Sequence, residues 1–249
     1  MKKLVICFFL LVFTTGISYA QIDKSLVAYW NFDDGKGGEA KDGSVNGFNG
    51  KLNGNPKWVD GKVGKALEFN GMDDFVEAVD ITTPGFLTFA CWFKKTGSGN
   101  GGVPRLHTRG TGPWSLEYGV GNTHQPKQLE FYLAFTDGST TSWTAFFEPE
   151  ENKWYHTAIS YDGTFVRTYV DGNEVYSSKD WAGKEINGGV SRIGAHAPAG
   201  DCFQGIIDEV VLCNTALSEN DINSLFTGSW LSVDTQGKIA ITWGMLKAK

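Results

Sequence analysis

The chain has 249 residues, with 22 lysines and arginines against 28 aspartates and glutamates, and a formal net charge of −6 at pH 7. This mildly acidic balance argues against a nucleic-acid partner, because nucleic-acid binding usually needs a basic face. The length suffices for one large domain with its own core. With 32 glycines and 14% aromatic residues, the composition favours aromatic-rich strands joined by glycine-rich turns, which is typical of a β-sandwich or barrel.

The first 20 residues have the layout of a secretory signal peptide. Lys2 and Lys3 precede an apolar run over Leu4–Phe13, and Ser18–Ala20 offers small residues for cleavage. The apolar run is too short to span a bilayer comfortably, and no later segment is suited to crossing a membrane. We therefore expect cleavage before Gln21, which N-terminal analysis would check. The mature protein is expected to be secreted or to lie in the cell envelope, for instance the periplasm.

Apolar and β-branched residues predict strands along most of the mature chain. Asp162-Gly163 and Asp171-Gly172 separate three short apolar runs. Asp-Gly supports the positive backbone φ angles of two-residue hairpins, so these runs should form an antiparallel meander. The other predicted strands are Leu26–Phe32, Lys65–Phe69, Phe75–Val79, Phe86–Lys94, Ser115–Val120, Gln128–Phe135, Thr140–Phe147, Val190–Gly194 and Gln204–Leu212.

One short helix is predicted near the C-terminus, over Glu219–Phe226. Ser218 suits its N-cap, because a side-chain oxygen there can accept a bond from an otherwise unpaired backbone N–H. Many short strands and one late helix indicate an all-β, two-sheet antiparallel sandwich over residues 21–227. The tail, residues 228–249, contains a possible extra strand at Lys238–Trp243.

Cleavage of the leader leaves Cys91, Cys202 and Cys213. An odd number of cysteines in an exported protein leaves at least one thiol unpaired or paired to another chain. Cys91 alternates with apolar neighbours, which predicts a buried thiol. Cys202 and Cys213 flank one predicted strand, and a straight strand would hold them too far apart for a disulfide.

Three stretches of the sequence resemble laminin G-like domains of the concanavalin A-like superfamily. "LVAYWNFDDGKGG", from Leu26, resembles the start of these domains, and "GIIDEVVLCNTALSENDI", from Gly205, resembles their closing motif. Between them, "KWYHTAISYDGTFVRTYVDGNEV" fits the same family, so the resemblance covers residues 25 to 227. It implies a jelly-roll sandwich, a fold that hosts many different functions.

The resemblance also implies a structural calcium ion where the two ends of the domain meet. Asp33 matches the family's acid after "YWNF", and Asp208 matches the acid of "IDE". Asp42 and Asn46 match its "D-x-S-x-N-G" turn. Calcium takes six to eight oxygen ligands from carboxylates, amides and carbonyls. The alternative is that Asp42 and Asn46 only build Asx-turns and that backbone donors satisfy Asp208.

A carbohydrate-binding surface is the second candidate site. Trp114, Tyr132 and Trp143 lie on or beside neighbouring middle strands, and sugar C–H faces stack on such rings. Polar side chains that could fix sugar hydroxyls lie near them in sequence, namely Arg105, His107, Arg109 and Glu130. The alternative is that these aromatic residues fill the core.

No catalytic constellation is expected. Glycosidases with this sandwich carry paired acids that flank the scissile bond. Here the neighbours Asp208 and Glu209 should point to opposite faces of a strand, and the sequence has no nucleophile elbow, metalloprotease motif or P-loop. We therefore expect a non-catalytic module that binds carbohydrate or a glycosylated or protein partner. The alternatives are an adhesion or assembly module of the cell envelope and a glycoside hydrolase.

Overall fold

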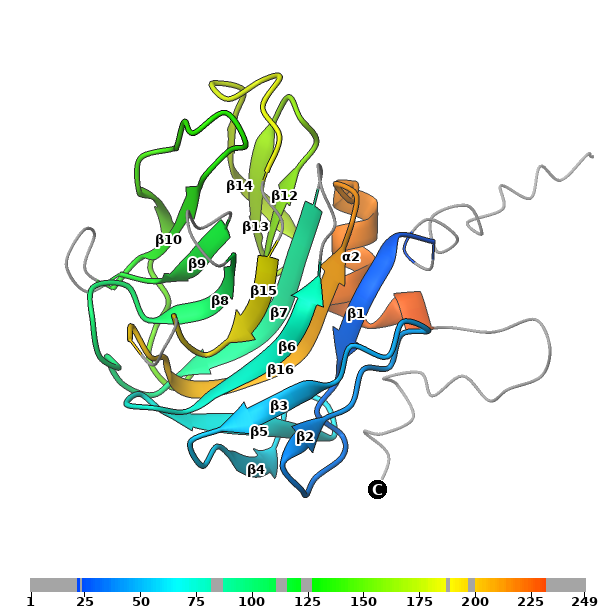
Figure 1. Ribbon diagram of the computed structural model, residues 1–249, viewed down its shortest axis with the longest axis vertical. Helices are drawn as coiled ribbons and strands as arrows, with labels where there is room; N and C mark the ends of the chain where they lie inside the picture. Colours follow the sequence, from blue (N-terminus) through cyan, green and yellow to red (C-terminus); the bar gives the residue numbers. More distant parts are fainter. Residues whose placement is uncertain are drawn as a thin grey trace, which may run out of the picture.

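The computed structural model describes residues 22, 24–81, 87–110, 116–121, 127–186, 189–196 and 200–231. The predicted signal peptide, Trp114 and the strand predicted at Lys238–Trp243 lie outside these residues. Within them the chain forms two antiparallel β-sheets, named sheet A and sheet B, which are layered face to face (Figure 1). The predicted all-β sandwich with one short helix is confirmed.

Sheet A is built around strand β16, which pairs with β1, β5 and β7. The order of its strands is β14-β13-β12-β7-β16-β5-β4, and β1 adds to β16 outside this path. Its strands are β1 (Leu26–Trp30), β4 (Lys57–Asp60), β5 (Lys65–Asn70), β7 (Leu87–Lys95), β12 (Trp154–Tyr161), β13 (Val166–Val170), β14 (Asn173–Ser178) and β16 (Gln204–Cys213).

Sheet B has the order β11-β10-β9-β8-β15-β6-β3-β2. Its strands are β2 (Glu39–Ala40), β3 (Gly50–Asn53), β6 (Phe75–Ile81), β8 (Arg105–Arg109), β9 (Leu116–Val120), β10 (Leu129–Leu133), β11 (Thr144–Phe147) and β15 (Gly189–Ile193). The sequence patterns did not predict β2, β3, β4 or β8. In β8 charged residues stand at both ends of a strand that is buried throughout, so its polarity resembles that of a loop.

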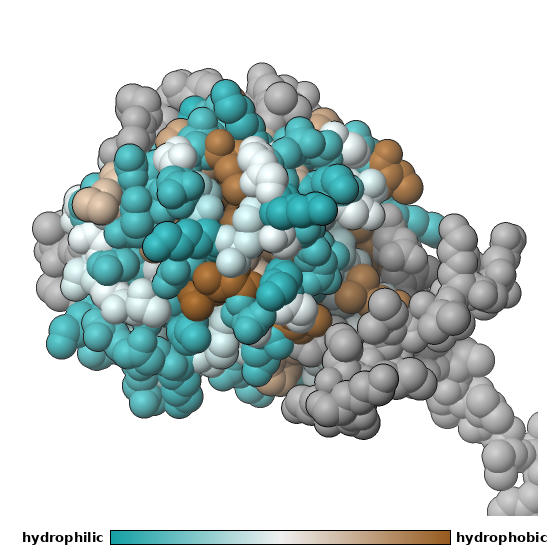
Figure 2. Space-filling model, turned by 90° about the horizontal axis from the view of Figure 1, so that it is seen from below, coloured by the Kyte–Doolittle hydropathy of each residue, from teal (hydrophilic) through white to brown (hydrophobic). Residues whose placement is uncertain are grey.

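The core lies between the two sheets and follows the alternation of side chains along each strand. Phe89 and Phe93 of β7 contribute to it from sheet A, and Tyr118 and Phe131 contribute from sheet B. Cys91 lies in the same core, and Cys202 and Cys213 are also buried with no disulfide. Seen from below, the surface is mainly hydrophilic, with apolar residues in small separate patches (Figure 2).

Helix α2 (Glu219–Thr227) closes the outer face of sheet A. Ser218 caps it in a capping box with Asp221, and Gly228 ends it in the left-handed region at φ 70°. Its buried apolar residues, Ile222 and Leu225, join a second apolar cluster with outward-facing residues of β7, β12, β13 and β16. Among the described residues, no helix is long and apolar enough to cross a membrane.

We expect the buried His156 to contribute less to stability as the solution becomes acidic. This histidine lies under α2 in contact with the rings of Trp92 and Phe226, and burial lowers its pKa to about 3. An unfolded histidine titrates near 6.5, so the unfolded chain binds the proton first, and stability falls as the pH drops below that value. Between pH 7 and pH 5 this one group should remove about 2 kcal/mol.

Denaturant unfolding of wild type and of His156→Phe at both pH values measures this contribution. The variant should lose about 2 kcal/mol less than wild type over the same interval. His107, whose pKa burial also lowers to about 3, is present in both proteins and cancels in the comparison. Equal acid losses in the two proteins would contradict the assignment.

Candidate functional site

The strand register carries one row of polar side chains across the outer face of sheet B. The neighbours of these residues along their strands, such as Val76, Ile193, Leu116 and Phe131, belong to the core. The row members therefore point away from the core. In order across the sheet the row is Glu39, Lys51, Glu77, Arg192, Thr108, Glu117 and Tyr132.

Arg105 joins this face because of a β-bulge in β8. It pairs with Gly119, whereas His107 pairs with Tyr118, so the register shifts between Arg105 and His107. Arg105 is buried, and its guanidinium forms an ion pair with Glu117 and lies 3.3 Å from Asp201. It also donates to the backbone oxygen of Val103.

Two aromatic rings continue this cluster. The Arg105 guanidinium lies 4.8 Å from the centre of the Trp143 ring, a cation–π contact. Trp143 and Tyr132 are half-buried, and their ring centres lie 5.3 Å apart at 33°. Their remaining surface is open to solvent beside charged groups.

The ion pair of Arg105 and Glu117 is expensive to bury. Desolvation of two charges often exceeds their mutual attraction, so a buried pair is weak evidence for stability. Here Asp201, Val103 and the Trp143 ring add bonds that offset part of this cost. His196 lies near the same charges, and burial lowers its pKa, so it is neutral at pH 7 and can donate and accept one hydrogen bond each.

The structure separates the four predicted sugar-binding residues. Tyr132 and Trp143 stack on the outer face of sheet B, whereas Trp114 lies outside the described residues. Arg109 is 1% exposed, and it pairs with Leu116 and Ser191 on the side of β8 that faces the core, so it does not lie on this face.

Sequence analysis named Arg105 as a polar neighbour of the aromatic residues but missed its partners Glu117 and Asp201. No local signal marks them, because they meet through the pairing of β8 with β9 and through a loop almost a hundred residues later. The outward direction of Tyr132 could be inferred from sequence, because apolar residues flank it on its predicted strand.

A second polar feature lies around the loop at residues 61–65, between β4 and β5. Asp208 Oδ2 accepts bonds from the backbone N–H groups of Lys62 at 2.8 Å and Val63 at 3.0 Å. Asp33 Oδ1 accepts from the N–H of Lys65 at 2.8 Å. A Cβ on Gly64, which has φ +50°, would lie 2.0 Å from Asp33 Oδ1, so the close approach requires glycine there. The structure thus brings Asp33 and Asp208 to one loop.

Asp208 and Glu209 form a buried acidic pair at a bulge in β16. Glu209 has φ 51°, and the register with β7 shifts between Asp208 and Val211, so simple alternation does not hold there. Burial, and then the charge of Glu209, raises the pKa of Asp208 to about 8. Burial also raises the pKa of Glu209 to about 7, although Tyr29 Oη donates to Glu209 Oε2 at 2.5 Å.

The two other predicted calcium ligands belong to a separate turn beside β1. Asp42 accepts from the backbone N–H groups of Tyr29 and Phe48 and from Ser44. The side-chain amide of Asn46 donates to the backbone oxygens of Leu26 and Val27. The bonds between Asp42 and Ser44 are those of an Asx-turn, whereas the bonds of Asn46 and the bond from Tyr29 tie this turn to β1.

The donor set of this region suits a hard cation only in part. Asp33 and Asp208 supply carboxylate oxygens, and a cation there would relieve the cost of burying the charge of Asp208. The side chain of the nearby Lys62 lies over the Trp92 ring, 4.3 Å from its centre. Among the described residues, no three His, Cys, Asp or Glu side chains converge to hold a metal, so backbone oxygens would have to complete the shell.

Two antiparallel sheets with an aromatic and polar outer face define a lectin-like β-sandwich. The Laminin_G_3 model, described as the concanavalin A-like lectin/glucanases superfamily, matches residues 70–223, more than half of the chain. The chain therefore belongs to this superfamily, and the resemblance seen in its sequence is confirmed.

Solved structures share the fold at low identity. Domain 4 of AbnA, a GH43 extracellular arabinanase from Geobacillus stearothermophilus, in complex with arabinotriose, has 20% identity and a TM-score of 0.64, with 81% of this chain and 98% of that chain covered. The binding domain of Paraclostridial Mosquitocidal Protein 1 has 16% identity and a TM-score of 0.66, with 84% of this chain and 53% of that chain covered.

A Trypanosoma rangeli sialidase in complex with the inhibitor DANA has 17% identity and a TM-score of 0.61, with 81% of this chain and 32% of that chain covered. The chain thus spans nearly all of the arabinanase domain, about half of the toxin domain and about a third of the sialidase. A search of curated proteins found no match.

We expect Asp208→Ala to destabilise the fold even in EDTA. Besides the two bonds to the loop, Asp208 Oδ1 accepts from the N–H of Glu209 at 2.8 Å. The substitution removes the acceptor for three backbone donors at a buried position, at a cost of about 3 kcal/mol in the free energy of unfolding. Asp60→Ala, an exposed acid of the adjoining β4, is the matched control and should stay within about 0.5 kcal/mol of wild type. Equal stability of the two variants would contradict this role.

Proposed function

We propose that the protein is an exported, non-catalytic carbohydrate-binding module that holds its ligand on the outer face of sheet B. The observation that carries the proposal is the stack of Tyr132 on Trp143 beside the buried Arg105–Glu117 pair. A half-exposed ring offers a stacking surface for sugar C–H groups, and adjacent fixed polar groups can orient hydroxyls.

The polar groups around the rings suit hydroxyl ligands. Asp201 and His196 are partly exposed. Asp201 accepts, and neutral His196 can donate and accept, so together they match a hydroxyl group, which also donates and accepts. The ion pair with Arg105 keeps Asp201 and Glu117 in fixed positions, so little conformational entropy is lost on binding. The arabinotriose complex of the arabinanase domain supports a sugar ligand for this fold.

The burial of the nearby acids argues against hydrolysis. Glu117 and Glu130 face the same side of sheet B on adjacent strands, since Glu130 pairs with Gly119, two residues beyond Glu117. This placement favours testing a hydrolase as the second candidate. However, Glu117 is 5% exposed and engaged in the ion pair with Arg105, and Glu130 is fully buried, so neither acid is open to a substrate. We therefore expect no release of reducing sugar from polysaccharides.

The proposal includes a structural calcium ion held by Asp33 and Asp208 with backbone oxygens of the 61–65 loop. Its support is the convergence of both carboxyl groups on this loop and the burial of Asp208, whose charged form a cation would favour. Such an ion would tie β16 to the β4–β5 loop and to the segment that follows β1.

Trp143→Ala should weaken binding to a polysaccharide by about 10- to 100-fold, because it removes the larger stacking ring. Folding should lose only about 1 kcal/mol, since the ring is half-buried. Binding is measured by titration against the strongest ligand from a glycan array, and stability by thermal melting.

Trp154→Ala is the matched control for this experiment. Trp154 is also half-buried, and Lys94 Nζ lies 5.2 Å from its ring centre, but it belongs to sheet A. Its removal should leave polysaccharide binding unchanged. Unchanged affinity in folded Trp143→Ala would reject the site, and absence of glycan binding with tail-dependent self-association would favour the assembly module.

Removal of calcium should lower the melting temperature. A ligand at about 100 times its dissociation constant stabilises the native state by about 2.7 kcal/mol. EDTA should abolish this gain, and calcium but not magnesium should restore it, because magnesium prefers a tighter octahedral shell. In Asp33→Asn, calcium should restore much less. Identical melts with and without metal, after elemental analysis confirms its removal, would reject the ion.

A further inference from the structure

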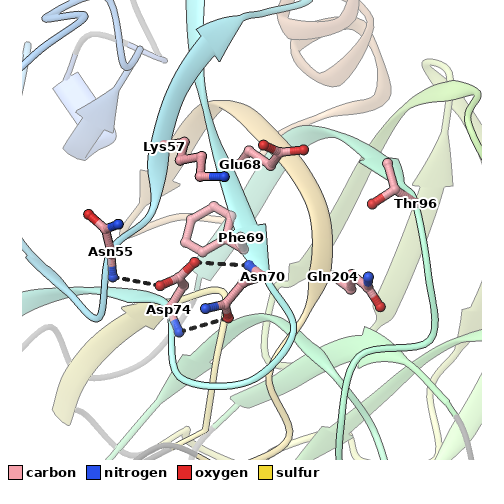
Figure 3. Close-up of a pocket in the computed structure, with 8 residues that line it drawn as sticks. All are labelled: Asn55, Lys57, Glu68, Phe69, Asn70, Asp74, Thr96 and Gln204. Carbon is pink, nitrogen blue, oxygen red and sulfur yellow. Dashed lines mark hydrogen bonds between the residues drawn. The ribbon is translucent and has the colours of Figure 1, made fainter.

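A cavity of about 360 Å³ opens on sheet A, away from the proposed site on sheet B (Figure 3). Lys57 of β4 and Glu68 of β5 are directly opposite each other, and Asn70 of β5 is opposite Gln204 of β16. Because Leu67, Phe69 and Ile207 belong to the core, Glu68 and Asn70 point outward. The volume lies in the range of small-molecule sites.

The walls of this cavity are held by a buried acid. Asp74, which is 2% exposed, accepts from the backbone N–H groups of Asn55 at 2.7 Å and Asn70 at 2.9 Å. Asn70 Oδ1 in turn accepts from the N–H of Met72 at 2.8 Å and from that of Asp73 at 3.2 Å. The segment before β4 and the turn between β5 and β6 are thus fixed to each other, which makes the cavity preformed.

Four polar side chains at the cavity retain their full hydrogen-bonding capacity. Within the described part of the chain, the side chains of Asn55, Lys57, Glu68 and Thr96 form no hydrogen bond or ion pair. Gln204 uses its Oε1 to accept from Gly99 N at 3.3 Å and keeps its amide N–H groups. Donors and acceptors from separate strands therefore converge on one space.

The chemistry of these groups selects the ligand class. The charges of Lys57 and Glu68 cancel, and two backbone donors engage Asp74, so the cavity is not built for an ion. Amide and hydroxyl side chains both donate and accept, as sugar hydroxyls do, and the buried Phe69 closes the floor of the cavity. We propose that this cavity is a second binding site, for a neutral monosaccharide or a cyclic polyol of the same size.

This site is independent of the proposed function, because it uses sheet A and needs neither Trp143 nor calcium. If both sites bind sugars, the domain is bivalent, and its affinity for a polymer exceeds that for either unit alone.

Saturation-transfer NMR and ¹H–¹⁵N shift titrations test the site with glucose, galactose, mannose, arabinose, xylose and myo-inositol. Glucuronate and alanine serve as charged comparisons. We expect at least one neutral probe to bind wild type and to shift the side-chain amides of Asn55 and Gln204. Lys57→Met and Glu68→Gln should each weaken this binding by about tenfold, since each removes a charged hydrogen-bonding partner.

Matched controls come from the same hairpin. Lys65→Met and Asp60→Asn alter an exposed pair at its other end, 2.7 Å apart, and should leave the affinity of the probe unchanged. Trp143→Ala should also leave it unchanged, even where polysaccharide binding is lost, so the two sites can fail separately. The proposal is overturned if no neutral probe binds, if only charged probes bind, or if Lys57→Met and Glu68→Gln bind as wild type does.

Discussion

The architecture depends on the central position of β16. This strand pairs with β7 and β5 and also receives β1, the first strand of the domain. Residues almost two hundred positions apart therefore meet in its ladders. Sheet A stays incomplete until nearly the whole chain is available, and the entropy of closing so long a loop is offset only when these pairings form. Folding dominated by such non-local contacts is expected to be slow.

Buried charge is arranged differently in the two polar regions. On sheet B, the cation of Arg105 faces Glu117 and Asp201, so opposite charges compensate each other. At the bulge of β16, Asp208 and Glu209 are both acids, and backbone donors and Tyr29 are their partners. The first arrangement holds its side chains in place without a bound ion. In the second, burial and mutual repulsion raise the pKa values of both acids, so protons neutralise them near pH 7 unless a cation favours their charged forms.

Local patterns predicted much of the fold. The Asp-Gly turns marked β12, β13 and β14, and Ser218 marked the start of α2, because hairpin and cap chemistry is set by a few adjacent residues. β1 ended earlier than predicted, at Trp30, and Phe32 has φ 54°, which lies outside the ordinary β region. β8 escaped prediction because its polarity is neutralised by partners on other strands. The Arg105 cluster was invisible for the same reason, whereas the pairing of Tyr132 with Trp143 needed only two neighbouring strands.

The bulge in β16 serves the placement of two acids more than the packing of the strand. Before it, Ile207 belongs to the core, and after it, Val210 and Leu212 do, so two residues instead of one separate consecutive inward positions. Loss of one of these two residues would restore simple alternation and would keep Val210 and Leu212 facing the core. The extra residue instead places Asp208 and Glu209, which bond the β4–β5 loop and Tyr29. A one-residue deletion at the bulge would therefore disturb the contacts of these two acids while the inward and outward faces of the strand are kept.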